Sequence, residues 1–347
     1  MDINKLEQFL IDNNHPKFRL EQIKKALYQD GVSTWSEITN LPLNLREKLE
    51  KEIKILSFKS KKVSKSKDGN SAEVLLELAD GSFIESVLIS PKPNTWSICV
   101  SCQVGCPIGC KFCATGKMGF ERNLTAEEIT DQVLFWRQYF KSKNRSDISN
   151  IVFMGMGEPF LNWDQVSESI KILTDKKLFG FGSRSISVST AGISDGIQKM
   201  AHEFPQINLA VSLHFTEDNK RSQFMPINVR YNLESLRKAL QKYFQIIKRK
   251  VFLEYIMLEN INDSHKDAKK LADYIKSINN NHLLHVNLIR FNPTPETSRE
   301  NMIPSSRNKT YLFKKELEKY HIGVTIRKSL GEEIRGACGQ LAGTGKK

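Results

Sequence analysis

The sequence lacks the long hydrophobic run that a membrane-spanning helix requires. No apolar stretch in the 347 residues approaches about eighteen residues, so we expect no membrane segment and no membrane partner. The N-terminus has neither a basic start nor an apolar stretch, which predicts that there is no secretory signal peptide. Internal repeats and low-complexity tracts are also missing. These absences predict a globular protein of the cytoplasm.

The composition is sufficient for a large folded domain with an added piece. Hydrophobic residues make up 39% of the 347 residues, which is enough to build a core. The 52 basic and 39 acidic residues give a formal net charge of +13. A basic surplus favours a polyanionic partner, and RNA is the obvious one. A generally basic cytosolic protein would have the same charge, so charge alone does not decide.

Cysteine is scarce, and five of the six cysteines lie between residues 99 and 113. Cys106, Cys110 and Cys113 form a Cys-x3-Cys-x2-Cys pattern, with Phe112 just before the last thiol. Cysteine thiolates are the usual ligands of iron–sulfur clusters. A structural zinc site needs four protein ligands, and no histidine lies nearby. A disulfide scaffold is unusual in a cytosolic chain of this size. The spacing therefore predicts a cluster with three protein ligands, which leaves one iron open for a substrate or cofactor.

The expected elements divide the chain into four parts. Residues 1–54 show helical hydrophobic spacing and are predicted to be a small accessory domain, which either binds RNA or caps the core. Residues 55–94 are predicted to be an antiparallel β extension, because Asp80-Gly81 joins two runs of β-forming residues. Strands and helices alternate through residues 95–328, and the glycine-rich residues 329–347 are expected to form a mobile tail.

Six successive strand–helix units predict a parallel sheet with right-handed crossovers. Six units rather than eight indicate an incomplete, open barrel. The strands are expected at residues 95–100, 148–154, 185–190, 207–214, 250–258 and 284–291, with a last strand at 322–328. The helices are expected at residues 125–141, 163–176, 194–201, 233–244 and 264–278, with a last helix at 305–320.

Polar residues and sharp turns fall at the ends of these strands, where parallel α/β barrels bind their ligands. The cysteine loop follows the first strand of the barrel. Gly155-Met156-Gly157-Glu158-Pro159 follows the second, and Glu158 offers a carboxylate to an ammonium group. Ser189 ends the third strand, Ser212-Leu213-His214 ends the fourth, and Asn292 follows the last. Their shared location predicts a single binding site.

The cysteine spacing resembles the signature of the radical S-adenosylmethionine (SAM) enzymes. The longer string from Cys99 to Leu124, and Gly336-Ala-Cys338-Gly-Gln-Leu-Ala-Gly343 near the C-terminus, resemble the RlmN/Cfr family of RNA adenine methyltransferases over nearly the whole chain. This resemblance implies an α/β fold: an incomplete (β/α)6 radical SAM barrel. It also implies a [4Fe–4S] cluster on Cys106, Cys110 and Cys113, with SAM as the second cofactor. The SAM contacts implied by the resemblance are Gly157, Glu158, Ser189, Ser212, Leu213, His214 and Asn292.

The resemblance implies roles for three further residues. Cys338 matches the methyl carrier, which forms an S-methylcysteine intermediate. Cys99 matches the resolving thiol, which forms a disulfide bond with Cys338 to release the RNA. Glu85 matches the proposed proton acceptor. Cys102 departs from the pattern, because relatives often have serine there, and it adds a thiol close to the ligand set.

The implied activity is methylation of C2 of adenine in 23S rRNA at the peptidyl-transferase centre, and in tRNA next to the anticodon. C2 lies between two ring nitrogens and is electron-poor, so it cannot attack a SAM methyl group directly and radical chemistry is needed. The nearest alternative is the Cfr branch, which methylates C8 of the same rRNA adenine and confers antibiotic resistance. The segment Thr115–Leu124 looks more like the RlmN branch.

A non-catalytic RNA-binding protein with a structural zinc or iron–sulfur site is an alternative of another class. It gives Glu158 and Cys338 no role. The resemblance also implies an external electron donor such as flavodoxin or ferredoxin, and we expect a monomer.

Overall fold

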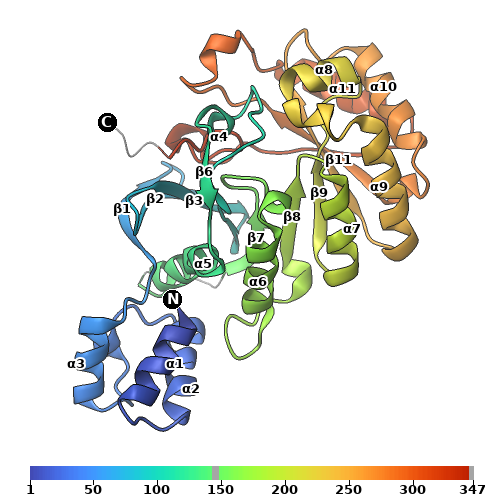
Figure 1. The fold of residues 1–347 in the computed structure, drawn as a ribbon. Coiled ribbons are helices and arrows are strands. Elements are labelled where there is room, and N and C mark those ends of the chain that lie inside the picture. The colour runs from blue at the N-terminus through green and yellow to red at the C-terminus, as the bar shows by residue number, and fades with distance from the viewer. Residues whose placement is uncertain (143–147, 344–347) are drawn as a thin grey trace.

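The structure is a computed structural model that describes residues 1–142 and 148–343. In these ranges ten strands form one sheet, in the order β1-β2-β3-β4-β7-β8-β9-β10-β11-β12. In this sheet β4 and the strands β7 to β12 run parallel to one another, whereas β1, β2, β3 and β4 pair antiparallel. Helices connect the successive parallel strands and flank the sheet (Figure 1). The predicted open α/β barrel is confirmed.

The strands are β1 (Phe58–Lys65), β2 (Ser71–Leu78), β3 (Phe83–Lys92), β4 (Thr95–Cys99), β5 (Gln103–Gly105), β6 (Phe120–Asn123), β7 (Ile148–Phe153), β8 (Ile186–Thr190), β9 (Asn208–Ser212), β10 (Val251–Met257), β11 (Leu284–Arg290) and β12 (Gly323–Ile326). The α-helices are α1 (Ile3–Asp12), α2 (Phe18–Lys24), α3 (Leu43–Glu52), α4 (Ala114–Lys117), α5 (Ala126–Lys141), α6 (Trp163–Thr174), α7 (Ser194–Glu203), α8 (Asp218–Phe224), α9 (Leu233–Ile246), α10 (His265–Lys276) and α11 (Arg307–Lys319). Within the described ranges, no helix has the length and apolar character needed to cross a membrane.

Helices α1, α2 and α3 form a small unit at one end of the molecule (Figure 1). Their apolar faces meet in a core in which Leu6, Ile23 and Leu45 are fully buried. The indole nitrogen of Trp35 donates a hydrogen bond of 2.7 Å to the carbonyl oxygen of Ile53. A helical unit therefore lies where the hydrophobic spacing predicted one, and RNA binding by this unit stays a prediction.

The antiparallel extension continues the barrel sheet beyond β4. Its register pairs Ser64 with Glu73, Glu73 with Val87, and Val87 with Cys99. Directly paired residues share one face of a sheet, so these four side chains form a row across β1 to β4. Glu85 lies two residues before Val87 on β3 and therefore points to the same face. The extension thus carries side chains toward the site as well as extending the sheet.

A second, two-stranded sheet brackets the cysteine loop. Strands β5 and β6 pair antiparallel on either side of residues 106–119. Gly105 has a φ of +73°, and a Cβ atom there would lie 2.0 Å from the carbonyl oxygen of Gly119, so only glycine fits. The N–H of Cys106 donates to that same oxygen at 2.7 Å. The sequence did not predict this hairpin, because strands of three and four residues are too short to show a period.

Candidate active site

Two adjoining cavities open at the carboxyl ends of the parallel strands. The cluster cavity contains the three thiols of the Cys-x3-Cys-x2-Cys pattern. The tail cavity lies next to it and contains Cys99. The two cavities share the lining residues Cys113, Met154, Gly155, Ile289, Arg327, Cys338 and Gly339. A molecule in one cavity would therefore lie close to groups that line the other.

Cys106, Cys110 and Cys113 line the cluster cavity together. Burial raises the pKa of the Cys106 thiol to about 12 and that of Cys110 well above its usual value. In the described part of the chain, no three His, Cys, Asp or Glu side chains are placed to hold a single metal ion. A cubic cluster needs a different arrangement, in which each thiolate binds its own iron. Three thiols that line one cavity fit that requirement.

Cys102 lies apart from these three cysteines. Its side chain is 2% exposed and belongs to the hydrophobic core, and it lines neither cavity. Its N–H donates to the carbonyl oxygen of Met156 at 2.9 Å. Its own carbonyl oxygen accepts a hydrogen bond of 2.8 Å from the Asn162 side chain. The additional thiol therefore acts as a small buried apolar group in this structure.

Glu158 lies buried in the wall of the cluster cavity. Its carboxylate accepts hydrogen bonds from the N–H groups of Ala191 at 2.7 Å and Phe160 at 3.2 Å. Burial raises the pKa of this carboxyl to about 7, although these hydrogen bonds oppose the shift. A buried carboxylate for which the described part of the chain provides no basic partner fits the ammonium group of an amino acid, as expected for SAM.

The other predicted SAM contacts are divided between three places. Gly157, Ser189, Ser212 and His214 line the cluster cavity with Glu158. Asn292 lines the tail cavity instead. Leu213 lines neither cavity, because its side chain is fully buried in the hydrophobic core. The structure thus brings most of this set together around one space, and their contacts with SAM remain predictions.

His214 and Asn292 present defined hydrogen-bonding atoms. The Nδ1 atom of His214 accepts from the N–H of Ile256 at 3.1 Å, and burial lowers the pKa of this histidine to about 3. The neutral ring therefore carries its proton on Nε2 and can donate from there. The side-chain nitrogen of Asn292 donates to the Cys338 carbonyl oxygen at 3.3 Å, while its buried Oδ1 atom has no hydrogen-bond partner among the described residues. An unpartnered amide oxygen fits a ligand hydroxyl or amine.

Cys99 and Cys338 face the same cavity. Cys99 is half-buried at the end of β4, and Cys338 is exposed on the tail. Both are free thiols. Burial raises the pKa of Cys99, and charge on Cys338 adds to this shift, as expected for neighbouring sulfurs. The two cysteines, 239 positions apart in the numbering (338 minus 99), are therefore brought to one space.

Glu85 lies beneath the tail and does not line either cavity. Its Oε2 atom accepts a hydrogen bond of 3.0 Å from the N–H of Ala342. The hydroxyl of Thr115 donates to the Leu341 carbonyl oxygen at 2.7 Å, and the N–H of Ala114 donates to that of Gly339 at 2.8 Å. The C-terminal segment accordingly lies beside α4 (Figure 1). Residues 329–343 of the predicted mobile tail are docked here, and residues 344–347 lie outside the described ranges.

Two charged residues of the site were missed by sequence reasoning. Glu254 of β10 is 3% exposed and lines the cluster cavity, and Arg327 lines both cavities. An Nη1 atom of Arg327 lies 3.4 Å from Oε2 of Glu254. Glu254 also accepts a hydrogen bond of 2.9 Å from the Asn287 side chain. A charged residue inside the apolar run of a buried strand was the available signal for Glu254.

Comparison with known proteins identifies the family of this chain. The family profile described as "Radical SAM superfamily" matches residues 100–272. A second family profile, described as "Ribosomal RNA large subunit methyltransferase N-terminal domain", matches residues 1–55. A ribosomal RNA large subunit methyltransferase Cfr of Clostridium botulinum (strain Okra / Type B1) is 41% identical, with 97% of this chain and 96% of that protein aligned. The chain belongs to the RlmN/Cfr family of radical SAM RNA methyltransferases.

Other relatives of this RlmN/Cfr-family chain carry the second name of the family. A probable dual-specificity RNA methyltransferase RlmN of Streptococcus suis (strain 98HAH33) is 39% identical, over 97% of this chain and 90% of that protein. The crystal structure of a radical SAM methyltransferase from Sphaerobacter thermophilus has a TM-score of 0.91 and 37% identity, covering 99% and 98% of the two chains. The predicted family, fold class and cofactors, a [4Fe–4S] cluster and SAM, are thereby confirmed.

Proposed function

We propose that this RlmN/Cfr-family enzyme methylates C2 of adenine in 23S rRNA at the peptidyl-transferase centre, and in tRNA next to the anticodon. The methyl group would pass through Cys338. One observation carries the proposal: Cys338 lines the cavity of Cys106, Cys110 and Cys113 and also the cavity of Cys99. In this proposal the methyl carrier, the resolving thiol and the cluster ligands would therefore act around one shared space. The names of the relatives support an RNA substrate.

In this proposal the residues of the cluster cavity hold the two cofactors. Cys106, Cys110 and Cys113 would bind three irons of the cluster. Glu158 would accept hydrogen bonds from the ammonium group of SAM, and His214 would donate from Nε2. When bound, the [4Fe–4S] cluster supplies the electron that cleaves SAM and begins the radical chemistry. The electron would come from an external donor such as flavodoxin or ferredoxin, which stays a prediction.

The tail cavity would handle the methyl group and the RNA. The Cys338 sulfur would first take a methyl group from SAM by displacement, since it lies at the border of the two cavities. After the carbon is joined to adenine, the ring proton would pass to Glu85, which lies just outside the tail cavity and accepts from the Ala342 N–H in this structure. Cys99 would then attack the Cys338 sulfur, so that a disulfide forms and the methylated RNA leaves. The target base must leave its stack to reach this site, so loop RNA is the expected substrate.

Methylation of C8, as in the Cfr branch, is the second candidate. Its support is the 41% identity to a protein named Cfr, but the 39% identity to a relative named RlmN is nearly equal, so the identities do not separate the two candidates. The segment Thr115–Leu124 looks more like the RlmN branch, and we therefore place C2 first.

Nucleoside analysis after reaction in vitro tests both candidates. Protein reconstituted without oxygen would be incubated with SAM, a reductant and either 23S rRNA or tRNA. We expect 2-methyladenosine, which differs from 8-methyladenosine in chromatographic retention and fragmentation. Cys338→Ala should give no methylated RNA, and Cys99→Ala should accumulate protein joined covalently to RNA. 8-Methyladenosine as the product would establish the second candidate, and methylation by Cys338→Ala would exclude the carrier role.

A further inference from the structure

Arg221 is a fully buried cation, and no described residue is its acidic partner. It lies on α8, and its side chain is 0% exposed. Every group that its guanidinium contacts is a neutral oxygen acceptor. These are the carbonyl oxygens of Leu213 at 3.1 Å, Tyr231 at 3.3 Å, Ala191 at 2.6 Å and Ser212 at 3.3 Å, and Oδ1 of Asn228 at 2.7 Å. Within residues 1–142 and 148–343, no carboxylate forms an ion pair with it.

A buried charge of this kind is costly. Removing a guanidinium from water costs several kcal/mol, on the order of the stability of a domain, unless other groups compensate. Neutral carbonyl groups compensate only in part. Burial lowers the pKa of Arg221, whereas negative charge on Tyr274, Cys110 or Asp218 would raise it. The side chain nevertheless stays protonated, because arginine does not lose its proton in proteins. A fixed positive charge therefore remains inside the molecule.

This charge lies directly behind the cluster cavity. Arg221 binds the carbonyl oxygens of Ala191 and Ser212, and both of these residues line that cavity. The last residue of α8, Phe224, accepts a hydrogen bond of 2.9 Å from the N–H of Lys111, which follows Cys110. Helix α8 is thus bonded both to the strand ends and to the cysteine loop.

The backbone next to the cavity leaves room for the guanidinium. Gly192 has a φ of +105°, and a Cβ atom there would lie 3.1 Å from Nη2 of Arg221. Hydrogen bonds on three edges fix the guanidinium in this place, so its charge cannot turn away toward solvent.

We infer that Arg221 is a positioning residue that raises the reduction potential of the cluster bound by Cys106, Cys110 and Cys113. The inference rests on the ligand set of the proposed function. Reduction adds one electron from an external low-potential donor, and no bond is made or broken. That electron adds negative charge in a site of low dielectric, where a fixed cation stabilises the reduced form. Net charge around an iron–sulfur cluster is one of the factors that set its potential.

Redox titration of the reconstituted holoenzyme, without SAM or RNA, tests this inference. The variants are Arg221→Gln, which removes the charge, and Arg221→Lys, which keeps the charge but lacks the planar set of guanidinium N–H donors. Arg249→Gln is the matched control: Arg249 is bonded to Asn208 at the amino end of β9, away from the cavities. The midpoint potential would be read from the absorption and electron paramagnetic resonance signals of the cluster.

We expect Arg221→Gln to shift the midpoint to a more negative value. The shift should reach at least a tenfold change in the ratio of reduced to oxidised cluster, which is about 59 mV for a one-electron couple. Arg221→Lys and Arg249→Gln should stay close to the wild type. Arg221→Met, which keeps the buried stem, replaces the glutamine variant if that protein does not fold.

Three results would overturn the inference. They are an unchanged potential in a folded neutral variant, an equal shift in the lysine and glutamine variants, and loss of the cluster from both neutral variants but not from the lysine variant. A wild-type protein that binds no cluster would instead refute the ligand set. The failure of the proposed function is therefore distinguishable from the failure of this inference.

Discussion

A buried carboxylate that has to bind an ammonium group makes that binding depend on pH. Burial raises the pKa of Glu158 to about 7, so protonation competes with SAM in neutral solution. We expect the affinity for SAM to fall as the pH decreases below about 7, by up to about tenfold per pH unit. Glu158→Gln should bind SAM weakly and without this slope. Equilibrium dialysis of cluster-loaded protein at several pH values would measure the affinity for SAM.

The matched control is Glu203→Gln, because Glu203 is bonded to the indole of Trp163 on the outer helices. It should retain both the affinity and the slope. A wild-type affinity that does not change between about pH 6 and 8 would contradict this role of Glu158.

Glu73 should make the folded protein less stable in alkaline solution. Burial, with added repulsion from Glu85, raises its pKa to about 7 from 4.5. The folded state therefore binds more protons than the unfolded state between these values, and this contribution to stability is lost as the pH rises toward 7. Glu73→Gln should raise the free energy of unfolding by about 2 kcal/mol at about pH 8 and hardly at all at about pH 4.

Denaturant unfolding at both pH values would measure this effect. Glu77→Gln on the same strand is the control, since Glu77 forms an ion pair with Lys61 at 3.2 Å at the surface. If the two variants change stability in the same way with pH, the burial of Glu73 is not the cause.

At the scale of single residues, the sequence predicted most directly those site residues that are close together along the chain. Cys106, Cys110 and Cys113 could be named because the spacing of three thiols is local. Arg327, Glu254 and Arg221 could not, because they approach the site only after strands far apart in sequence become neighbours. Positions at strand ends predicted one shared site, but no pattern along the chain identified these three charged residues as its neighbours.

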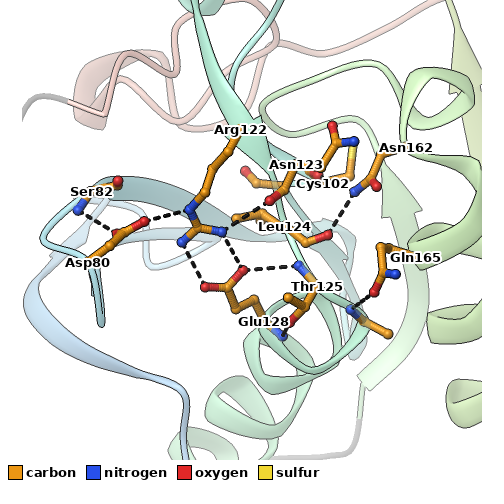
Figure 2. Close-up of polar contacts among 12 residues, drawn as sticks. Asp80, Ser82, Cys102, Arg122, Asn123, Leu124, Thr125, Glu128, Asn162 and Gln165 are labelled. Carbon is orange, nitrogen blue, oxygen red and sulfur yellow. Dashed lines mark hydrogen bonds and ion pairs between the residues drawn. The ribbon is translucent and has the colours of Figure 1, made fainter.

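Among the elements, the hairpin of β5 and β6 depends on one ion-pair network. Figure 2 shows Arg122 of β6 between Glu128 of α5 and Asp80 of the β2–β3 turn. The two terminal nitrogens of Arg122 bind the two oxygens of Glu128 at 2.8 and 2.9 Å. Glu128 also accepts from the N–H of Thr125 at 3.0 Å, completing the capping box of α5. The Arg122 side chain is thus engaged within the protein.

Replacing Arg122 should loosen the loop that carries the cysteines. Arg122→Ala leaves the partly buried carboxylate of Glu128 without its cation, so we expect a loss of about 2 kcal/mol in stability. The substitution should also lower the iron content, because β6 is one of the two strands that flank the cysteine loop. Thermal unfolding and iron analysis of reconstituted protein would measure both effects. Lys141→Ala, which removes an exposed ion pair with Glu37 at 3.5 Å, should change neither.

Strands and helices of the barrel were predictable because their hydrophobic periods extend over many residues. Strand β10, expected at residues 250–258, is Val251–Met257, and α6, expected at 163–176, is Trp163–Thr174. The missed elements are short: β5, β6, α4, α8 and the π-helical turn at Lys25–Gln29. They are held by a close approach of two glycines or by tertiary packing, which leave no period in the sequence.

At the scale of the whole molecule, the docked C-terminal segment contacts both the cysteine loop and the antiparallel extension. Thr115→Val removes a donor and leaves the Leu341 carbonyl oxygen without its partner, at a cost of about 1 kcal/mol. We expect about fivefold faster amide exchange in residues 337–342, and an unchanged iron content. Hydrogen–deuterium exchange with mass spectrometry would measure the rates. Thr174→Val, which removes a bond within α6, is the control, and equal protection in both variants would contradict the prediction.

The pairing of β1 to β4 limits where this chain can gain or lose a residue. Neighbouring side chains alternate between the two faces, so a single insertion between β3 positions 85 and 87 would turn one of Glu85 and Val87 outward. The acid would then lose the Ala342 N–H, or the valine would no longer stand beside Cys99. An insertion in the turn at Gly81 would leave this alternation intact and would affect mainly the Asp80–Arg122 ion pair, so it should cost less than an insertion a few residues later. Spacing within this segment is therefore as restrictive as the identity of its acids and thiols.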